Sequence, residues 1–267
     1  MCRETEVSRA GFYRRWRESA PREEETGLRG LIQRLAMETR AYGYRRIGAA
    51  LRRQGWIVNH KRVLRLMRED NLLSLRHKGF VPATTDSGHP WRVYPNLARG
   101  MGLTGLNQLW VADITYIRLR EEFVYLAVIL DAYSRRVVGW ALERHLEASL
   151  AVAALDKAVA GRAVPEGMVH HSDRGVQYAS RDYVERLEGC KIQISMSRPA
   201  NPYDNAKAES FFKTLKAEQL DGSEYRDLED LLPRAELMLE RYYNEHRMHS
   251  ALGYRSPAEF EQALAGK

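Results

Sequence analysis

Three apolar segments between residues 109 and 142 constrain the fold of this 267-residue chain more than any other feature. Residues 109–119 (LWVADITYIRL) are rich in β-branched and aromatic side chains, and residues 123–130 (FVYLAVIL) are almost wholly apolar. A polar turn at 131–135 separates them from 136–142 (RVVGWAL). Apolar runs joined by short polar turns are typical of β-strands. The three segments therefore predict an antiparallel meander with a buried middle strand.

Helical and strand patterns alternate after the meander. Helices are expected at 147–160, 180–188, 203–218 and 228–243, and short strands at 168–170 and 191–195. Three hairpin strands followed by alternating helices and strands predict an α/β fold, a mixed five-stranded sheet with helices on its faces. The apolar face of the last helix is expected to carry Leu228, Leu231, Leu232, Ala235, Leu239 and Tyr242.

The positive charge is concentrated in the first third of the chain. The whole chain has 42 basic and 35 acidic residues, but residues 1–80 hold 19 basic and 9 acidic ones. Residues 81–267 hold the remaining 23 basic and 26 acidic side chains. A basic module beside a near-neutral one suggests a head that binds a polyanion. The alternative is an Arg-rich helical surface that is merely solvated.

Two short helices are predicted in this basic head. The first, 45–54, has Ile47, Ala50 and Leu51 at helical spacing, and Gly55 ends it. Asn59 is a good N-cap for a second helix, 60–70, which should bury Val63, Leu64 and Met67 and expose Lys61, Arg62, Arg65 and Arg68. This arrangement over residues 43–73 matches a helix-turn-helix, with a plain helical hairpin as the alternative. Upstream, Gly27 and Gly30 interrupt a looser helical pattern.

These patterns divide the chain into four parts. We expect a small all-α DNA-binding head at 1–78, a Pro/Gly-rich linker at 79–105, a catalytic core at 106–222, and a C-terminal helix and tail packed on the core at 223–267.

Composition excludes several classes of protein. No run approaches the roughly 18 apolar residues of a membrane helix, and the first residues lack the apolar stretch of a signal peptide. Cys2 and Cys190 are too few for a disulfide scaffold or a cysteine-based zinc site. We therefore expect a cytoplasmic protein with no membrane partner.

Three acidic residues stand out by position. Asp113 lies inside the first strand, where a buried carboxylate is costly unless it is paired or bound to a metal ion. Asp173 follows the strand that ends at His170, and Glu209 lies on a helix with Asn205 one turn before it. Thirty-five residues separate Asp173 from Glu209. Hard divalent cations prefer such oxygen ligands, and two ions about 4 Å apart can drive phosphodiester chemistry.

Each carboxylate also has a structural interpretation. Asp113 could be satisfied by hydrogen bonds, Asp173 could cap the turn before Gly175, and Glu209 could be a solvated helix residue. The three together, in this order and spacing, favour a cation site.

Several segments carry a resemblance to a known family. They closely resemble the orfB products of bacterial insertion sequences of family three, from the head to the tail: YGYRRIGAALRRQGWIVNHKRVLRLMRE, VADITYI, LDAYSRRVVGWAL, HSDRGVQYAS, SRPANPYDNAKAESFFKTLKAE and YYNEHRMHSALGYRSPAEF. The resemblance implies an RNase H-like core shared with retroviral integrases, DDE transposase activity, and Mg²⁺ or Mn²⁺. Asp113, Asp173 and Glu209 match the triad positions of the family.

The resemblance also implies a mechanism and partners. Water cuts the transposon end and leaves a 3′-hydroxyl, which attacks another phosphodiester directly, with no covalent protein intermediate. Paired double-stranded DNA ends imply a homo-oligomer associated with the nucleoid. Family members often act with a protein made from an upstream frame, which carries a coiled coil. This chain has no long heptad repeat and resembles the downstream frame alone.

We predict DNA contacts from eight further residues. They are Lys61, Arg62 and Arg65 in the head, and Arg174, Asn205, Lys207, Lys213 and Lys216 in the core. Point charges suit contacts to the phosphate backbone, which carry no sequence information. The alternative for the core lysines is a solvated helix face.

Other polar residues have competing structural interpretations. His171, like Arg174, either contacts DNA phosphate or holds Asp173. Asp131 is expected to stabilise the turn at 131–135. Pro202 and Tyr203 either wedge near DNA or fix the start of a helix. We expect Arg247, His249 and Tyr254 to pack in the tail rather than touch DNA.

Two other functions compete with the transposase. A tyrosine recombinase would use the His171–Arg174 pair with Tyr203 as nucleophile, but this interpretation leaves Asp113 and Glu209 unexplained and conflicts with the β-rich pattern. The head lacks the His/Cys spacing of a retroviral zinc module. A non-catalytic DNA-binding repressor or subunit derived from a transposase is the alternative function.

Overall fold

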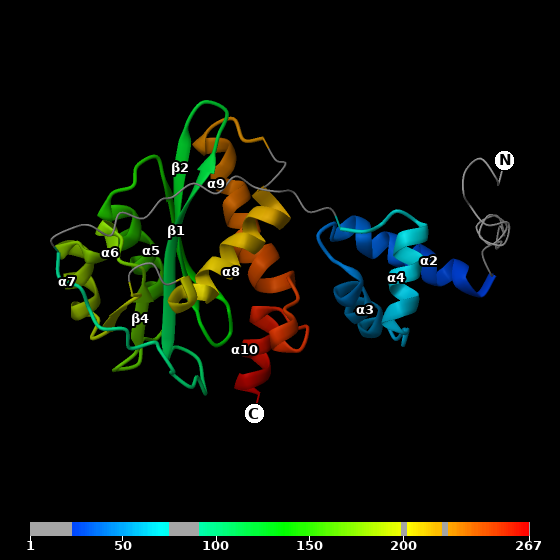
Figure 1. Ribbon diagram of the computed structural model, residues 1–267, viewed down its shortest axis with the longest axis horizontal. Helices are drawn as coiled ribbons and strands as arrows, with labels where there is room; N and C mark the ends of the chain where they lie inside the picture. The colour runs from blue at the N-terminus through cyan, green and yellow to red at the C-terminus, as the bar shows by residue number, and fades with distance from the viewer. Residues whose placement is uncertain (1–22, 75–90, 199–201, 221–223, 267) are drawn as a thin grey trace, which may run out of the picture. The chain divides into compact units, whose positions relative to one another are not determined.

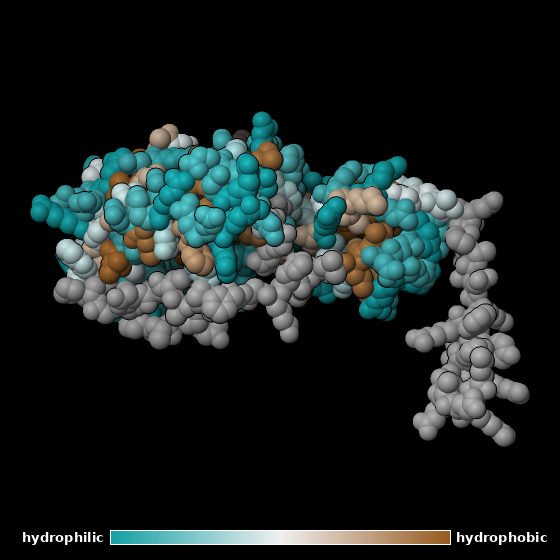
Figure 2. All heavy atoms as spheres, turned by 90° about the horizontal axis from the view of Figure 1, so that it is seen from above, coloured by the Kyte–Doolittle hydropathy of each residue, from teal (hydrophilic) through white to brown (hydrophobic). Residues whose placement is uncertain are grey.

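The computed structural model describes residues 23–74, 91–198, 202–220 and 224–266, and the chain divides into two compact units, Met1–Leu75 and Arg76–Lys267 (Figure 1). Cys2 and part of the segment 79–105 lie outside the described residues. Among the helices that are described, none has both the length and the apolar character needed to cross a bilayer. Figure 2 shows hydrophilic residues over most of the visible face of each unit, with smaller hydrophobic patches between them.

The described residues of the first unit, 23–74, form a bundle of three helices, α2 (Glu23–Glu38), α3 (Tyr44–Arg53) and α4 (His60–Glu69). Helix α3 ends at Gly55, which has a φ of 84°, and the N–H of Trp56 bonds back to the carbonyl of Leu51 at 2.9 Å. Asn59 caps α4, because its side chain accepts from the N–H of Lys61 at 2.8 Å. The predicted pair of helices and its turn are confirmed.

Two expectations for this unit were wrong. Helix α2 runs without a break through Gly27 and Gly30. Its buried face, Leu28, Leu31, Ile32 and Leu35, packs in the bundle core and outweighs the roughly 1 kcal/mol that each glycine costs a helix. Helix α4 buries Leu66 rather than Leu64, because positions 63, 66 and 67 share one face.

The second unit is built on a five-stranded sheet. The strands are β1 (Leu109–Arg118), β2 (Phe123–Asp131), β3 (Val137–Glu143), β4 (Val169–Ser172) and β5 (Gln193–Met196), in the order β3-β2-β1-β4-β5. β1, β2 and β3 form the antiparallel meander, and β4 joins β1 and β5 in parallel. The predicted mixed sheet and α/β class are confirmed.

Helices cover both faces of the sheet (Figure 1). On one face lie α5 (Ala148–Gly161), α6 (Val176–Ala179) and α7 (Arg181–Gly189), packed on apolar residues such as Trp110, Ala112 and Ile129. On the other face lie α8 (Ala206–Leu215), α9 (Leu228–Glu236) and η3 (Leu237–His246), packed on Val111, Leu126 and Val128. The short elements η1 (Pro202–Asn205), η2 (Lys216–Leu220) and η4 (Ser250–Leu252) link these helices.

The C-terminal part differs from its expected pattern. From Leu237 the helix is π-helical, so Tyr243 is buried in place of Tyr242, and Leu232 is 44% exposed. A final helix, α10 (Pro257–Ala265), begins with a capping box between Ser256 and Glu259. The sequence Ser-Pro-Ala-Glu at 256–259 carries the signal of this capping box.

The described end of the segment 79–105 lies on the sheet unit. The N–H of Leu97 donates to Ser195 Oγ at 2.8 Å, and the N–H of Met196 donates to the carbonyl of Pro95 at 3.4 Å. Residues 95–97 therefore contact β5, the edge strand of the sheet, without forming a further strand.

Candidate active site

Asp113 lies where two parallel strands part. β1 pairs with β4 over Leu109–Val111 only, so β1 continues past this ladder at Asp113. Asp113 lies two residues after Val111 on β1, and residues at this spacing share one face of the sheet. Val111 faces the core beneath α8, so the side chain of Asp113 also lies on the α8 face. Asp173 follows directly after β4. The carboxyl ends of parallel strands meet at one edge of a sheet, which brings the two aspartates together.

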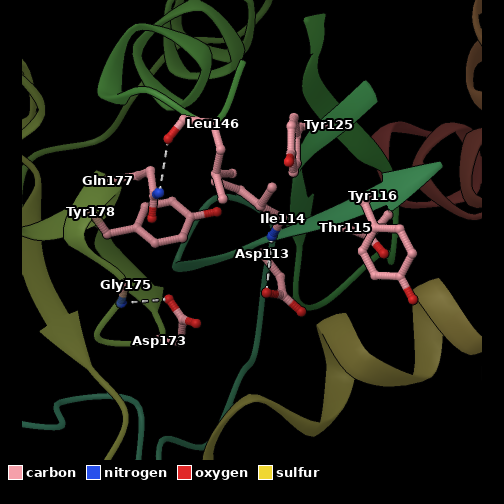
Figure 3. A pocket seen from close by; sticks show the side chains of 10 residues that line it. All are labelled: Asp113, Ile114, Thr115, Tyr116, Tyr125, Leu146, Asp173, Gly175, Gln177 and Tyr178. Carbon is pink, nitrogen blue, oxygen red and sulfur yellow. Dashed lines mark hydrogen bonds between the residues drawn. The ribbon is translucent and has the colours of Figure 1, made fainter. Parts of the chain in front are cut away.

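The two aspartates line one small pocket of about 30 Å³. Figure 3 shows both carboxylates turned toward the space between β1 and the loop after β4. Asp113 Oδ1 accepts from the N–H of Ile114, and Asp173 Oδ1 accepts from the N–H of Gly175, each at 2.9 Å. The other lining residues are Ile114, Thr115, Tyr116, Tyr125, Leu146, Gly175, Gln177 and Tyr178.

The pKa of Asp113 is raised to about 8. Burial is the largest cause, and the negative charges of Asp173 and then Glu209 add to it, while the N–H of Ile114 and the charge of Lys216 oppose it. The three acidic residues therefore share one electrostatic environment. A bound cation would relieve the repulsion among them.

Glu209 is exposed on α8 rather than inside the pocket. The start of α8 is tied to β1, because Asn205 Nδ2 donates to the carbonyl of Ala112 at 3.0 Å, one residue before Asp113. Nevertheless, the described residues contain no group of three His, Cys, Asp or Glu side chains close enough to hold a metal ion. The structure thus brings Asp113 and Asp173 into one pocket and leaves Glu209 outside it, within electrostatic reach.

The predicted DNA-contacting residues of the core have different environments. Lys207 Nζ donates to the carbonyl of Ala132 at 2.9 Å, and Arg174 Nε donates to the carbonyl of Ser197 at 2.7 Å. Lys216 lies over the ring of Tyr116, 4.5 Å from its centroid. Lys213 is exposed on α8. Lys207 and Arg174 are therefore each held by a backbone carbonyl of the core, whereas Lys213 has an exposed position on α8.

In the head, two of the basic residues predicted to contact DNA, Arg62 and Arg65, are engaged with acidic neighbours. Arg65 bonds Glu25 at 2.7 Å and Glu69 at 2.9 Å, and Arg62 pairs with Glu25 at 3.2 Å. The hydrogen bond from Arg65 lowers the pKa of Glu25. Arg62 and Arg65 thus help to hold α4 against α2, while Lys61 is exposed in the first turn of α4.

His171 has a structural role. It is fully buried, and its two ring nitrogens hydrogen-bond Ser195 Oγ at 2.8 Å and Ser197 Oγ at 3.0 Å. Burial lowers its pKa, so the ring stays neutral. His171 therefore locks β4 to β5, and a DNA contact or a recombinase role for it is excluded by this burial. The side chains of Pro202 and Tyr203 lie outside the described residues.

Two structural expectations are confirmed. Asp131 is buried and accepts from the N–H groups of Asn107, Tyr133 and Ser134 at 2.7–2.8 Å, so it stabilises its turn. In the tail, the buried Arg247 forms a bidentate pair with Glu218 at 2.6 and 2.7 Å, and His249 is also buried.

Sequence reasoning missed the pocket residues around the aspartates. Tyr116 and Tyr125 are cross-strand partners on β1 and β2, and Gln177 donates to the carbonyl of Leu146 at 2.9 Å. A Cβ at Gly175 would lie 3.0 Å from both Asp173 Oδ1 and Gln177 Oε1, so glycine permits this close approach. Only the glycine two residues after Asp173 was a usable signal, since α6 is too short to give a periodic pattern.

Comparison with known families and proteins gives consistent matches. The family "Integrase core domain" matches residues 104–202, a second family of that description matches 190–257, and the family "HTH-like domain" matches 22–80.

Among curated proteins, the chain is 38% identical to "Insertion element IS600 uncharacterized 31 kDa protein" of Shigella sonnei, over 98% of this chain and 97% of the relative. It is 36% identical to "Transposase InsF for insertion sequence IS3A" of Escherichia coli K12, over 98% and 92%. It is also 36% identical to "Transposase for insertion sequence element IS904" of Lactococcus lactis, over 83% and 87%.

Similar solved structures are more distant. The integrase catalytic core of HTLV-2 in complex with magnesium has a TM-score of 0.44 and 16% identity, covering 58% of this chain and 95% of that one. The catalytic core of BIV integrase has a TM-score of 0.43 and 18% identity, covering 60% and 97%.

Proposed function

Because the chain belongs to the insertion-sequence transposases of the IS3 type, which carry an integrase core and a helix-turn-helix head, we propose a specific route for its reaction. It cuts the ends of its element to leave 3′-hydroxyls and joins them to DNA by direct transesterification. Asp113, Asp173 and Glu209 are the catalytic carboxylates of this reaction.

One observation carries this assignment. Asp113 and Asp173 line a single pocket, and the pKa of Asp113 is raised to about 8 by burial and by the charges of Asp173 and Glu209. Buried carboxylates that repel one another destabilise the fold, and strongly perturbed pKa values of this kind cluster at functional sites. Glu209 lies on α8, within electrostatic reach of Asp113.

The carboxylates fit a hard divalent cation, Mg²⁺ or Mn²⁺, and we propose two ions per site. Asp113 and Asp173 offer oxygen ligands, and backbone N–H groups orient one oxygen of each. When bound, the ions would activate the attacking oxygen and stabilise the leaving one. The chain itself orients the carboxylates from β1, from the loop after β4 and from α8, while Asn205 ties α8 to β1.

The remaining proposals concern DNA and partners. The head, residues 1–78, binds the terminal DNA through Lys61, Arg62 and Arg65, and the core, 106–222, contacts phosphates through Arg174, Lys207, Lys213 and Lys216. Asn205, predicted as a further DNA contact, is buried and holds α8 to β1 instead. The segments 79–105 and 223–267 serve as linker and as a buttress of the core. Two DNA ends require at least a homodimer, and the upstream-frame protein is a further partner. This activity places the protein at the nucleoid in the bacterial cytoplasm.

The test is cleavage and joining of labelled terminal DNA of the element with Mg²⁺ or Mn²⁺, with and without the upstream-frame protein. Glu209→Gln should lower the rate by more than about 100-fold, beyond the effect typical of outer-shell residues. The control is Glu166→Gln, an exposed glutamate outside the pocket. Equal rates for wild type and Glu209→Gln would remove Glu209 from the site. Binding without cleavage by the wild type in every mixture would favour the non-catalytic repressor.

A further inference from the structure

Tyr178 is a buried tyrosine on the wall of the aspartate pocket. Its side chain is 3% exposed and lies in α6, five residues after Asp173. Among the residues that the structure describes, none hydrogen-bonds the Tyr178 hydroxyl. Leaving a buried hydroxyl without a partner is costly, so the position calls for a polar group that enters the pocket.

The neighbouring aromatic residues do not supply that group. Tyr183 uses its hydroxyl to bond His170 Nε2 at 3.0 Å, whereas the ring centroids of His170 and Tyr178 are 6.5 Å apart. Burial holds the pKa of His170 at about 3, so the imidazole is neutral. The Tyr183 hydroxyl and His170 Nε2 are therefore paired with each other, and neither is a partner of the Tyr178 hydroxyl.

The Tyr178 hydroxyl is directed into the pocket. Figure 3 shows it pointing toward β1 beside Ile114, with the Asp113 and Asp173 carboxylates both below it in this view of the pocket. Burial raises the pKa of Tyr178 well above its usual value, with smaller contributions from Tyr183 and then from Asp113 and Asp173. The hydroxyl therefore stays protonated and can both donate and accept hydrogen bonds.

We propose that the Tyr178 hydroxyl hydrogen-bonds the hydration water of the divalent cation held by Asp113 and Asp173, and so positions that cation. This inference rests on the proposed function. The pocket, about 30 Å³, admits water-sized groups, and Mg²⁺ usually keeps several of its waters when only a few carboxylates bind it. Tyr178 is a positioning residue in this arrangement, because it acts on the cation through water.

The test compares two neighbouring tyrosines in the full chain. Tyr178→Phe removes a hydroxyl with no protein partner, and Tyr183→Phe removes one that bonds His170. Two quantities are measured without DNA: the melting temperature in EDTA, and the dissociation constant for Mn²⁺ from a titration with MnCl₂ followed by electron paramagnetic resonance. Asp113→Asn is included to report on the cation site itself.

The proposal predicts opposite behaviour for the two variants. Tyr178→Phe should keep or raise the melting temperature and weaken Mn²⁺ binding by about two- to tenfold, the range of one hydrogen bond. Tyr183→Phe should melt at a lower temperature and bind Mn²⁺ like the wild type.

Two failures are distinguishable. Wild-type Mn²⁺ affinity in Tyr178→Phe would overturn the role of Tyr178 while leaving the cation site intact. If the wild type bound no Mn²⁺, or Asp113→Asn bound it equally well, the cation site of the proposed function would itself be wrong.

Discussion

Asp113 couples the stability of the metal-free protein to pH. Its pKa is about 8 in the folded chain and close to 3.8 in an unfolded one, so the folded state holds an extra proton between these values. A raised folded-state pKa contributes stability that is fully present below about pH 4 and is lost as the pH rises through 8. Asp113→Asn cannot ionise, and its amide oxygen can still accept from the N–H of Ile114.

The resulting prediction concerns a difference between two proteins. In EDTA, the unfolding free energy of Asp113→Asn minus that of wild type should increase steadily between pH 4 and pH 8, as measured by urea denaturation at several pH values. Adding Mg²⁺ at pH 8 should stabilise the wild type and not the variant. If this difference in unfolding free energy stayed constant between pH 4 and pH 8, ionisation of Asp113 would not destabilise the folded protein.

At this scale, sequence reasoning located the residues whose chemistry conflicts with their surroundings. Asp113 is an acidic residue between apolar residues, Val111, Ala112 and Ile114, and the amino-acid sequence alone shows this conflict. The unpartnered hydroxyl of Tyr178 is not visible in this way, because it depends on where β1 and β4 part. The burial of His171 between Ser195 and Ser197 depends on the same strand pairing.

At the scale of elements, β3 and α5 approach each other closely at Gly139. A Cβ built on Gly139 would lie 2.2 Å from the carbonyl oxygen of Ala154 and 2.7 Å from the Cβ of Ala158. The first contact is with helix backbone, which cannot move aside. We predict that Gly139→Ala destabilises the protein by at least about 1–3 kcal/mol, the cost of overpacking, in urea denaturation.

A matched substitution in the same pair of elements provides the control. Gly161 ends α5, and no atom lies within 4 Å of the Cβ that it would gain. Gly161→Ala should be neutral or stabilising by up to about 1 kcal/mol, because alanine restricts the unfolded chain. Similar losses for both variants would mean that the contact between β3 and α5 does not carry the effect.

The elements themselves were predictable where their pattern is local. The meander, the Asn59 cap and the stop at Gly55 follow from periodicity and turn chemistry. The continuity of α2 through its glycines and the π-helical register from Leu237 do not, since tertiary packing decides both. A one-residue shift in that register exchanges Tyr242 for Tyr243 in the core, which no helical template of period 3.6 anticipates.

At the scale of the whole molecule, the two compact units should separate DNA binding from chemistry. Arg62 and Arg65 are engaged with Glu25, so replacing them would mix loss of DNA contact with loss of packing between α2 and α4. Lys61 is exposed in the first turn of α4 and is the cleaner probe. The counterpart in the core is Glu209, exposed on α8.

We predict a double dissociation between these two residues. Lys61→Ala should weaken binding to terminal DNA and lower the slope of log affinity against log salt by about 1, as expected for one phosphate contact, with Mn²⁺ affinity unchanged. Glu209→Gln should bind the same DNA as tightly as wild type but fail to cut it. Filter binding at several salt concentrations, with the Mn²⁺ titration and the cleavage assay, measures all three properties. If Lys61→Ala lowered Mn²⁺ affinity, or if Glu209→Gln lost DNA binding as Lys61→Ala does, the division of labour between head and core would be wrong, because each unit would then depend on charges in the other.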